Sequence, residues 1–427
     1  MDENIPSGRL GRAARLAYLG ARAGAGALVD RRGEKAAARA TEVLGSMRGL
    51  AAKVGQMASY VDGVVPEAQR EAYEAALSKL RDAAPASSPD AIRRCVEEEL
   101  GAPIDRLFAE WSEAPMASAS IGQVHRATLL DGTPVAVKVQ HPGIDAAIDH
   151  DLKNAGIMAG LQSTLLGSKW GFGEAMDEVS QLFREELNYA LEGQRQTYFR
   201  ALHADDPRIA IPRVIEDRTA TRVLTTELVS GLRFEEACQG SDAQRRAWSE
   251  ALWAFVFRST LVGGTFNADP HPGNFFFQED GTVTALDFGC VVTLSEERIR
   301  LARAVHEAAL DMDEARFRAA GRVMMATRGG DFEHVIVEYL RRCFDPLFET
   351  PYRMTRGYAG SLVSGMMDGA KAGLRVKKDE FVPLPEGTVM MNRLQFGFYS
   401  VLARLDAEAD YQGVERALLN EPAQAAR

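Results

Sequence analysis

Carboxylate and amide side chains stand at a spacing that suggests chemistry in the second half of the chain. Asn274 follows Asp269 by five positions, and Asp287 opens an Asp-Phe-Gly sequence thirteen positions after Asn274. In phosphoryl transfer, one aspartate orients or deprotonates the nucleophile, while an asparagine and a second aspartate hold Mg²⁺ on the phosphates. Oxygen ligands of this kind suit Mg²⁺, which keeps several waters. The spacing therefore predicts a magnesium-dependent phosphoryl-transfer site.

A lysine upstream adds a third element to this pattern. Lys138 ends a Val-Ala-Val-Lys sequence, and a charge among valines on a buried strand is costly unless it is paired. Phosphate oxygens and a glutamate on a helix would supply that pairing. The alternative is a lysine on the solvent-facing side of an edge strand, which composition alone leaves open.

Each motif also has a plainer interpretation. Asp, Pro, Gly and Asn gather in turns for conformational reasons, but the ordered combination with Lys138 is far more specific than a turn. A metal hydrolase built from Asp269, His271 and Asp287 is a weak alternative, because the chain lacks the paired-histidine spacing of such sites.

The residue pattern also predicts the elements that must position these side chains. Asp131-Gly132 is a strong hairpin signal, and Asp90 is expected to cap a helix. The expected elements are strands at 135–139, 223–228, 275–277 and 283–286, and helices at 92–100, 174–194 and 243–262. Strands and helices do not alternate as in a doubly wound sheet, and neither GxGxxG after a strand nor GxxxxGK[ST] occurs. The fold class expected is α+β.

Composition excludes several classes of protein. The 427 residues carry a formal net charge of −10, which argues against a nucleic-acid partner because that role needs a clustered positive face. The four cysteines form no CxxC pair, so they are expected to be reduced thiols. No stretch approaches the roughly 18 apolar residues of a membrane span, and no signal peptide is recognised. A cytoplasmic protein is expected. An arginine-rich helix at 9–29 is either a membrane-surface helix or a solvated one.

Further motifs give these residues a family resemblance. Lys138, Asp269, Asn274 and Asp287 resemble the protein-kinase-like pattern, and their surroundings are similar to the UbiB/AarF family of atypical kinases, which is linked to ubiquinone and related prenyl-lipid metabolism. The additional motifs are Lys53-Val-Gly-Gln56 for KxGQ, 116–124 for the Ala-rich loop, Glu186-Leu-Asn188 for ExD or ExN, and 226–231 for the hinge between lobes.

The resemblance implies a fold and a set of domains. The expected fold is protein-kinase-like, with a small N-lobe that contains the sheet, a mostly helical C-lobe, and an N-terminal helical extension that carries KxGQ. The implied boundaries are 1–100 for the extension, 101–230 for the N-lobe and 231–427 for the C-lobe.

The resemblance also implies roles for individual residues. Asp269 takes the position of the catalytic-loop aspartate, Lys138 contacts the α- and β-phosphates, and Asn274 and Asp287 become magnesium ligands. Nucleotide contacts are further implied for Ala117, Ser118, Ala119 and Ser120 above the phosphates, for the backbone near Glu227 and Val229 at the adenine, and for Lys53 and Gln56, whose helix face packs over the site. Glu178 and Glu186 lie eight positions apart on the expected 174–194 helix, nearly on one face, and either is a candidate partner for Lys138.

The Ala-rich loop, which stands where ordinary kinases have glycines, and two departures from the family pattern affect these expectations. Alanine in place of glycine restricts positive φ in the phosphate loop, so nucleotide geometry, including any preference for ADP over ATP, should differ from that of a protein kinase. Asn267 stands where many relatives carry histidine, which removes one hydrogen-bonding support of the catalytic loop, although asparagine can replace part of it. Asn188 removes a negative charge, and His271 is expected to fix the loop rather than act as a base.

Two functional hypotheses follow. The first is a Mg²⁺-dependent enzyme that binds ATP or ADP, an atypical kinase or ATPase that supports quinone or other prenyl-lipid metabolism and is not a conventional protein kinase. The second is a non-catalytic module in which nucleotide gates the binding of lipid or a protein partner, with methionines near 354–391 adapting to apolar shapes. A prenyl lipid or quinone precursor is the implied partner, and any membrane contact is expected to be peripheral.

Overall fold

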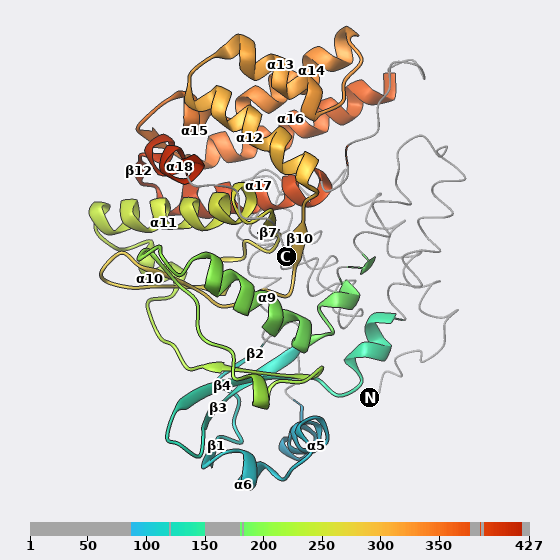
Figure 1. The fold of residues 1–427 in the computed structure, drawn as a ribbon, viewed down its shortest axis with the longest axis vertical. Helices are drawn as coiled ribbons and strands as arrows, with labels where there is room; N and C mark the ends of the chain where they lie inside the picture. The colour runs from blue at the N-terminus through green and yellow to red at the C-terminus, as the bar shows by residue number, and fades with distance from the viewer. Residues whose placement is uncertain are drawn as a thin grey trace, which may run out of the picture.

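A small antiparallel sheet and a larger group of helices form the two parts of the molecule in the computed structural model (Figure 1). The structure describes residues 87–118, 121–149, 180–181, 183–375, 385 and 388–420. The sheet lies at one end of the molecule, the long helices at the other, and helix α9 (Tyr189–Leu202) runs between them. This arrangement is the α+β, kinase-like fold that the sequence predicts.

The sheet has five strands, and all of its pairings are antiparallel. Its order is β1-β3-β4-β6, and β2 also pairs with β3. The strands are β1 (Glu110–Trp111), β2 (Ala117–Ser118), β3 (Gly122–Thr128), β4 (Pro134–Gln140) and β6 (Val223–Glu227). The Asp131-Gly132 turn is present as predicted, and Gly132 has a φ of 89°, a conformation that glycine adopts without steric strain.

Alternation along β4 decides where Lys138 points. Val135, Val137 and Val139 are fully buried in a core shared with α5 (Pro89–Leu100) and α6 (Ile104–Leu107). Because successive side chains of a strand face opposite sides, Lys138 faces the other side, toward α9. The strand is central, since it pairs with both β3 and β6. The alternative of a lysine on an edge strand is therefore wrong.

Two helix starts differ from the sequence prediction. Helix α5 is capped by the Ser88 side chain, which accepts from the Ala91 amide, and Asp90 lies inside its first turn. A continuous 174–194 helix is also wrong among the described residues, because the chain turns at Glu186 and Leu187 before α9 begins. The Asn188 side chain accepts from the Leu191 amide and acts as N-cap of α9. Asparagine favours this position because its oxygen satisfies an otherwise unpaired helix amide.

The larger part is built from long helices around an aromatic core. The principal helices are α11 (Asp242–Leu261), α12 (Glu296–Leu310), α13 (Glu314–Met324), α14 (Gly330–Cys343), α16 (Arg356–Arg375), α17 (Thr388–Leu405) and α18 (Tyr411–Leu419), with short turns at α10 (Phe234–Ala237) and α15 (Asp345–Phe348). Helix α11 is the apolar helix predicted at 243–262. It begins with a capping box between Ser241 and Gln244, and it buries Trp248 and Trp253 completely.

Short strands outside this sheet flank the residues of the kinase-like pattern. Strand β7 (Thr265–Asn267) pairs with β10 (Val291–Thr293), and β8 (Phe275–Phe277) pairs with β9 (Val283–Ala285), which β5 (Ile209–Ala210) joins in parallel. The strands of the predicted hairpin are therefore present. Strands β11 (Tyr352–Arg353) and β12 (Glu408–Ala409) pair with each other, which joins the segment before α16 to the segment before α18.

None of the described helices is long and apolar enough to cross a membrane.

Candidate active site

An ion-paired cluster joins the sheet, α9 and the Asp-Phe-Gly segment. The Nζ of Lys138 lies 2.8 and 3.0 Å from the two carboxylate oxygens of Glu192 and 3.2 Å from Oδ2 of Asp287. Glu192 is 2% exposed, so its charge depends on this pairing. The cluster brings together residues that lie 54 and 149 positions apart in the sequence.

Charge balance in the cluster favours an additional cation. Burial lowers the pKa of Lys138, but the carboxylates of Asp287 and Glu192 outweigh it and raise that pKa well above the usual value. Burial, together with the charges of Asp287 and Glu186, raises the pKa of Glu192 to about 7 against the opposing effect of Lys138. Two carboxylates thus share the Lys138 ammonium group, and a divalent cation would relieve their repulsion.

The donor set fits magnesium held mainly by phosphates. Among the described residues, no group of three or more His, Cys, Asp or Glu side chains is arranged to hold a metal. Asp287 and Asn274 together offer one carboxylate and one amide oxygen, and Mg²⁺ is commonly bound by one or two carboxylates, substrate phosphates and waters. These two residues would hold the ion once phosphates supply the remaining ligands.

The catalytic-loop candidates contact one another and α17. The Asn274 side-chain amide donates to the backbone carbonyl of Asp269 at 3.2 Å and to its Oδ2 at 3.4 Å. Asp269 is 6% exposed, and its Oδ1 lies 3.3 Å from a guanidinium nitrogen of Arg393 on α17. His271 accepts from the Gly273 amide through Nδ1 at 3.0 Å, which supports the expected loop-fixing role.

Asn267 connects the two halves of the site. Its side-chain amide donates to the backbone carbonyl of Asp287 at 2.6 Å, and its Oδ1 accepts from the Asp269 amide at 3.0 Å. The sequence predicted that asparagine here would supply only part of the support that histidine gives. In the structure, one side chain makes a hydrogen bond to each of the two segments that carry the acidic residues.

Helix α9 also contacts the segment after Asp287. Arg195, three positions after Glu192, donates to the Gly289 carbonyl at 3.1 Å and pairs with Glu185. Residues three apart lie on one helical face, so α9 holds both the lysine cluster and the glycine after Phe288. Glu186 borders the same place, since a Cβ built on Gly289 would lie 3.6 Å from its Cγ.

The structure describes only some of the residues that are expected to contact nucleotide. Ala117 is exposed on β2, and Ser118 pairs in the backbone with Gln123. Glu227 ends β6, with its carboxylate 2.9 Å from the Nε of Arg213. The Leu228 amide donates to Pro134, and no described residue accepts from the Val229 amide. The remaining candidates, Lys53, Gln56, Ala119, Ser120 and Glu178, lie outside the described residues.

Two charged residues in contact with the site were missed by the sequence analysis. The structure pairs Lys138 with Glu192, whereas the sequence proposed Glu178 or Glu186. Recognising Asn188 as a cap would have started the helix at Tyr189 and placed Glu192 in its first turn. Arg393 carries no local signal, because packing of α17 brings it to Asp269 from 124 positions away.

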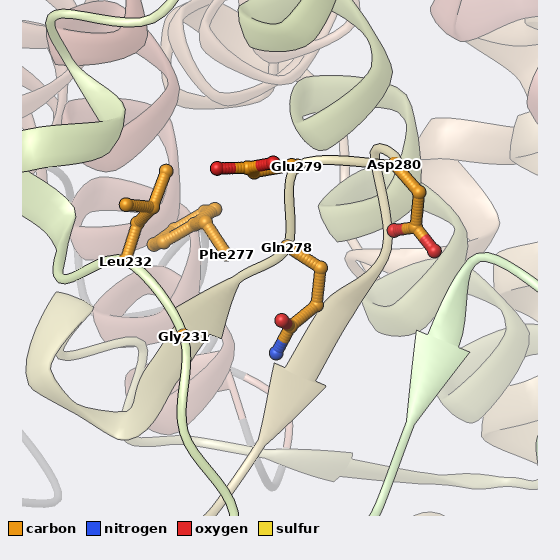
Figure 2. A pocket seen from close by; sticks show the side chains of 6 residues that line it. All are labelled: Gly231, Leu232, Phe277, Gln278, Glu279 and Asp280. Carbon is orange, nitrogen blue, oxygen red and sulfur yellow. The ribbon is translucent and has the colours of Figure 1, made fainter.

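A hollow on the surface lies apart from these residues (Figure 2). It is lined by Gly231, Leu232, Phe277, Gln278, Glu279 and Asp280. The Gln278 amide donates to the Ser230 carbonyl at 2.8 Å, and a Cβ on Gly231 would lie 2.7 Å from that amide nitrogen. The hollow contains none of the four residues in the kinase-like pattern. At this hollow, the segment that follows β6 is hydrogen-bonded to the β8–β9 hairpin through Ser230 and Gln278.

Comparison with known proteins agrees with this geometry. The family model of the ABC1 atypical kinase-like domain matches residues 79–320. The chain belongs to the ABC1 atypical kinase family. The family resemblance drawn from the motifs is thereby confirmed, because relatives within the family include proteins named UbiB and COQ8B.

Relatives of this ABC1 family member come from bacteria and eukaryotic organelles. The chain is 30% identical over 383 residues to the mitochondrial atypical kinase COQ8B of Rattus norvegicus, covering 88% of this chain and 70% of the relative. It is 33% identical to the probable protein kinase UbiB of Marinobacter nauticus, covering 70% and 56%. It is 37% identical to the chloroplastic Activity of bc1 Complex Kinase 7 of Arabidopsis thaliana, covering 56% and 34%. The chain thus spans about a third of that plant relative.

A solved structure has the same fold. The Rv3197–erythromycin complex of Mycobacterium tuberculosis matches with a TM-score of 0.62 and 27% identity, covering 89% of this chain and 95% of that one.

Proposed function

We propose that this ABC1 family member is a Mg²⁺-dependent enzyme that binds ATP or ADP, an atypical kinase or ATPase that supports quinone or other prenyl-lipid metabolism. The observation that carries the proposal is the contact of Lys138 with both Glu192 and Asp287. An amine fixed between a helix glutamate and a metal-binding aspartate matches the arrangement that positions phosphates for transfer.

The roles of the chain's own residues follow from their contacts. Lys138 would bind phosphate oxygens, and Asn274 and Asp287 would hold Mg²⁺, which neutralises charge on the phosphates during transfer. Asp269, held by Asn274 and Arg393, would orient the acceptor. The lobe boundaries 101–230 and 231–427, the extension at 1–100 and the covering role of Lys53 and Gln56 remain part of this proposal.

Partners are proposed on chemical grounds and by analogy with relatives. Nucleotide is the first partner, and a prenyl lipid or quinone precursor is the second, reached through peripheral membrane contact. The net charge of −10 argues against nucleic acid.

One contact favours the alternative of a nucleotide-gated binding module. The Arg393 guanidinium occupies one carboxylate oxygen of Asp269, so the residue expected to orient an acceptor is already engaged. In such a module, nucleotide binding through Lys138 and Asp287 would matter, and turnover at Asp269 would not.

Thermal-shift titration with ADP and ATP, each with and without Mg²⁺, tests binding, because a ligand that binds only the folded state stabilises it. We expect Mg²⁺-dependent stabilisation that Asp287→Asn abolishes. Turnover is then measured with and without lipid vesicles and a quinone-like phenol. Loss of turnover in Asp269→Asn with retained binding supports the enzyme. Retained cellular function in the same variant supports the module, and absence of any nucleotide stabilisation rejects both.

A further inference from the structure

A tyrosine beside the lysine cluster has a hydroxyl that the proposed chemistry has not used. Tyr189 is the first residue of α9 and is fully buried. Its hydroxyl oxygen is inaccessible, and no described residue makes a hydrogen bond with it. Buried polar groups in folded proteins nearly always have partners, and an exception calls for an explanation such as an absent water, ion or ligand.

The position of the ring links Tyr189 to Lys138. The Nζ of Lys138 lies 4.8 Å from the centre of the Tyr189 ring, a distance at which an ammonium group is attracted to an aromatic face. The backbone holds the ring there, because the Tyr189 amide donates to the Thr221 carbonyl at 2.9 Å next to β6. The tyrosine is therefore a fixed part of the cluster.

The hydroxyl lies under the start of β3. A Cβ built on Gly122 would lie 2.8 Å from the Tyr189 oxygen and 2.4 Å from the Val139 carbonyl, so the hydroxyl meets the backbone where the Ala-rich loop enters the strand. The ring of Tyr189 thus lies against the ammonium of Lys138, and its hydroxyl lies against Gly122 at the start of β3.

The chemistry of the hydroxyl suits an anion. Burial raises the pKa of Tyr189, against the effect of Lys138, so the hydroxyl keeps its proton and remains a donor. A donor without an acceptor, carried by a ring that lies against a fixed ammonium group, is suited to receive a negatively charged oxygen.

We propose that the Tyr189 hydroxyl donates a hydrogen bond to a phosphate oxygen of the bound nucleotide, so that Tyr189 is a second phosphate-binding side chain beside Lys138. This inference rests on the proposed function. It assigns a ligand contact to a residue outside the Lys138, Asp269, Asn274 and Asp287 pattern.

The test is Tyr189→Phe, which keeps the ring against Lys138 and removes only the hydroxyl. The matched control is Tyr198→Phe on the same helix, whose hydroxyl already donates to the Gly263 carbonyl at 2.8 Å. Dissociation constants are measured by calorimetry for adenosine, ADP and ATP in the presence of Mg²⁺, and unfolding temperatures are measured without ligand.

We expect Tyr189→Phe to bind ADP and ATP about tenfold more weakly, which corresponds to about 1.4 kcal/mol, and to bind adenosine as the wild type does. Its ligand-free unfolding temperature should be unchanged or higher, because an unpaired hydroxyl is removed. Tyr198→Phe should show the opposite pattern, with lower stability and unchanged affinities.

Two results would overturn the inference while leaving the proposed function intact. One is ADP affinity in Tyr189→Phe equal to that of the wild type. The other is an equal loss for adenosine and ADP, which would mean that the tyrosine acts through the shape of the site. If the wild type binds neither ADP nor ATP, the proposed function fails, and this inference fails with it.

Discussion

Replacing Asn267 by alanine should disconnect the two acidic segments of the site. The side chain donates to the Asp287 carbonyl at 2.6 Å and accepts from the Asp269 amide at 3.0 Å. Asn267 is 8% exposed and Asp269 is 6% exposed. Leaving a buried partner unsatisfied costs about 1–3 kcal/mol. With two partners affected and the Asp287 side chain partly exposed, we expect a loss of about 2–4 kcal/mol in the free energy of unfolding.

The functional effect should exceed the loss of stability. Without the shared side chain, the Asp269 and Asp287 segments can shift independently, and a displacement of about 1 Å at reacting groups can reduce turnover about 100-fold. We expect weaker Mg²⁺–ADP binding and a comparable loss of any nucleotide turnover. Urea denaturation gives the stability change, and calorimetry with turnover measurement gives the functional change.

Thr265→Val is the matched control for this experiment. Thr265 lies on the same short strand and donates through its hydroxyl to the Val292 carbonyl at 3.0 Å, but it contacts neither acidic segment. Its loss should cost about 1 kcal/mol and leave nucleotide affinity unchanged. The reasoning is refuted if Asn267→Ala resembles this control, with stability within about 1 kcal/mol of wild type and full nucleotide affinity.

Three further predictions concern the residues around the site and the core. Glu192→Gln removes the carboxylate that pairs with Lys138, and breaking a buried ion pair costs about 3–5 kcal/mol. We expect lower stability in denaturation and weaker Mg²⁺–ATP binding in calorimetry. Unchanged affinity would contradict the assigned pairing. Burial lowers the pKa of His203 to about 3, whereas the unfolded chain protonates histidine near pH 6.5. The stability that the buried neutral imidazole contributes is therefore complete above pH 6.5 and is lost as the pH falls toward 3. Between about pH 6 and 4, His203→Gln should therefore reduce the slope of unfolding free energy against pH by about 1.4 kcal/mol per unit, and an unaltered slope in pH-dependent urea titrations would show that another group is responsible. A Cβ at Gly397 would lie 2.5 Å from the Cγ of Pro270. Gly397→Ala should therefore lower stability by about 1–3 kcal/mol and reduce nucleotide turnover. Wild-type values in both assays would show that the loop at Pro270 moves aside without cost.

Local patterns were sufficient to predict the parts of the fold that short stretches of chain determine. The Asp131-Gly132 turn and the β-branched strand at 135–139 follow from turn chemistry and strand preference. The hairpin strands that lead to Asp287 follow for the same reason. These features depend on residues close together in sequence, which is the range over which residue spacing carries structural information.

The errors arose where a local cap or a distant contact determines the structure. Periodicity from 174 onward suggested one helix, but Asn188 offered its side chain to the Leu191 amide and the helix began there. With the helix beginning at Tyr189, Glu192 lies in its first turn and pairs with Lys138. The environment of Asp269 was beyond any local pattern, since Arg393 reaches it only after the helical part has packed.

The contact between α17 and the catalytic loop has a practical consequence for dissecting this protein. The family match ends at residue 320, whereas Arg393 and Gly397, one turn apart on α17, touch Asp269 and Pro270. A recombinant fragment trimmed to residues 79–320 would retain Lys138, Asp269, Asn274 and Asp287 but would lose KxGQ at 53–56 and the whole of α17. It would also expose the acidic loop to solvent and remove the Arg393 guanidinium from Asp269, so biochemical work should keep the chain at least as far as residue 405.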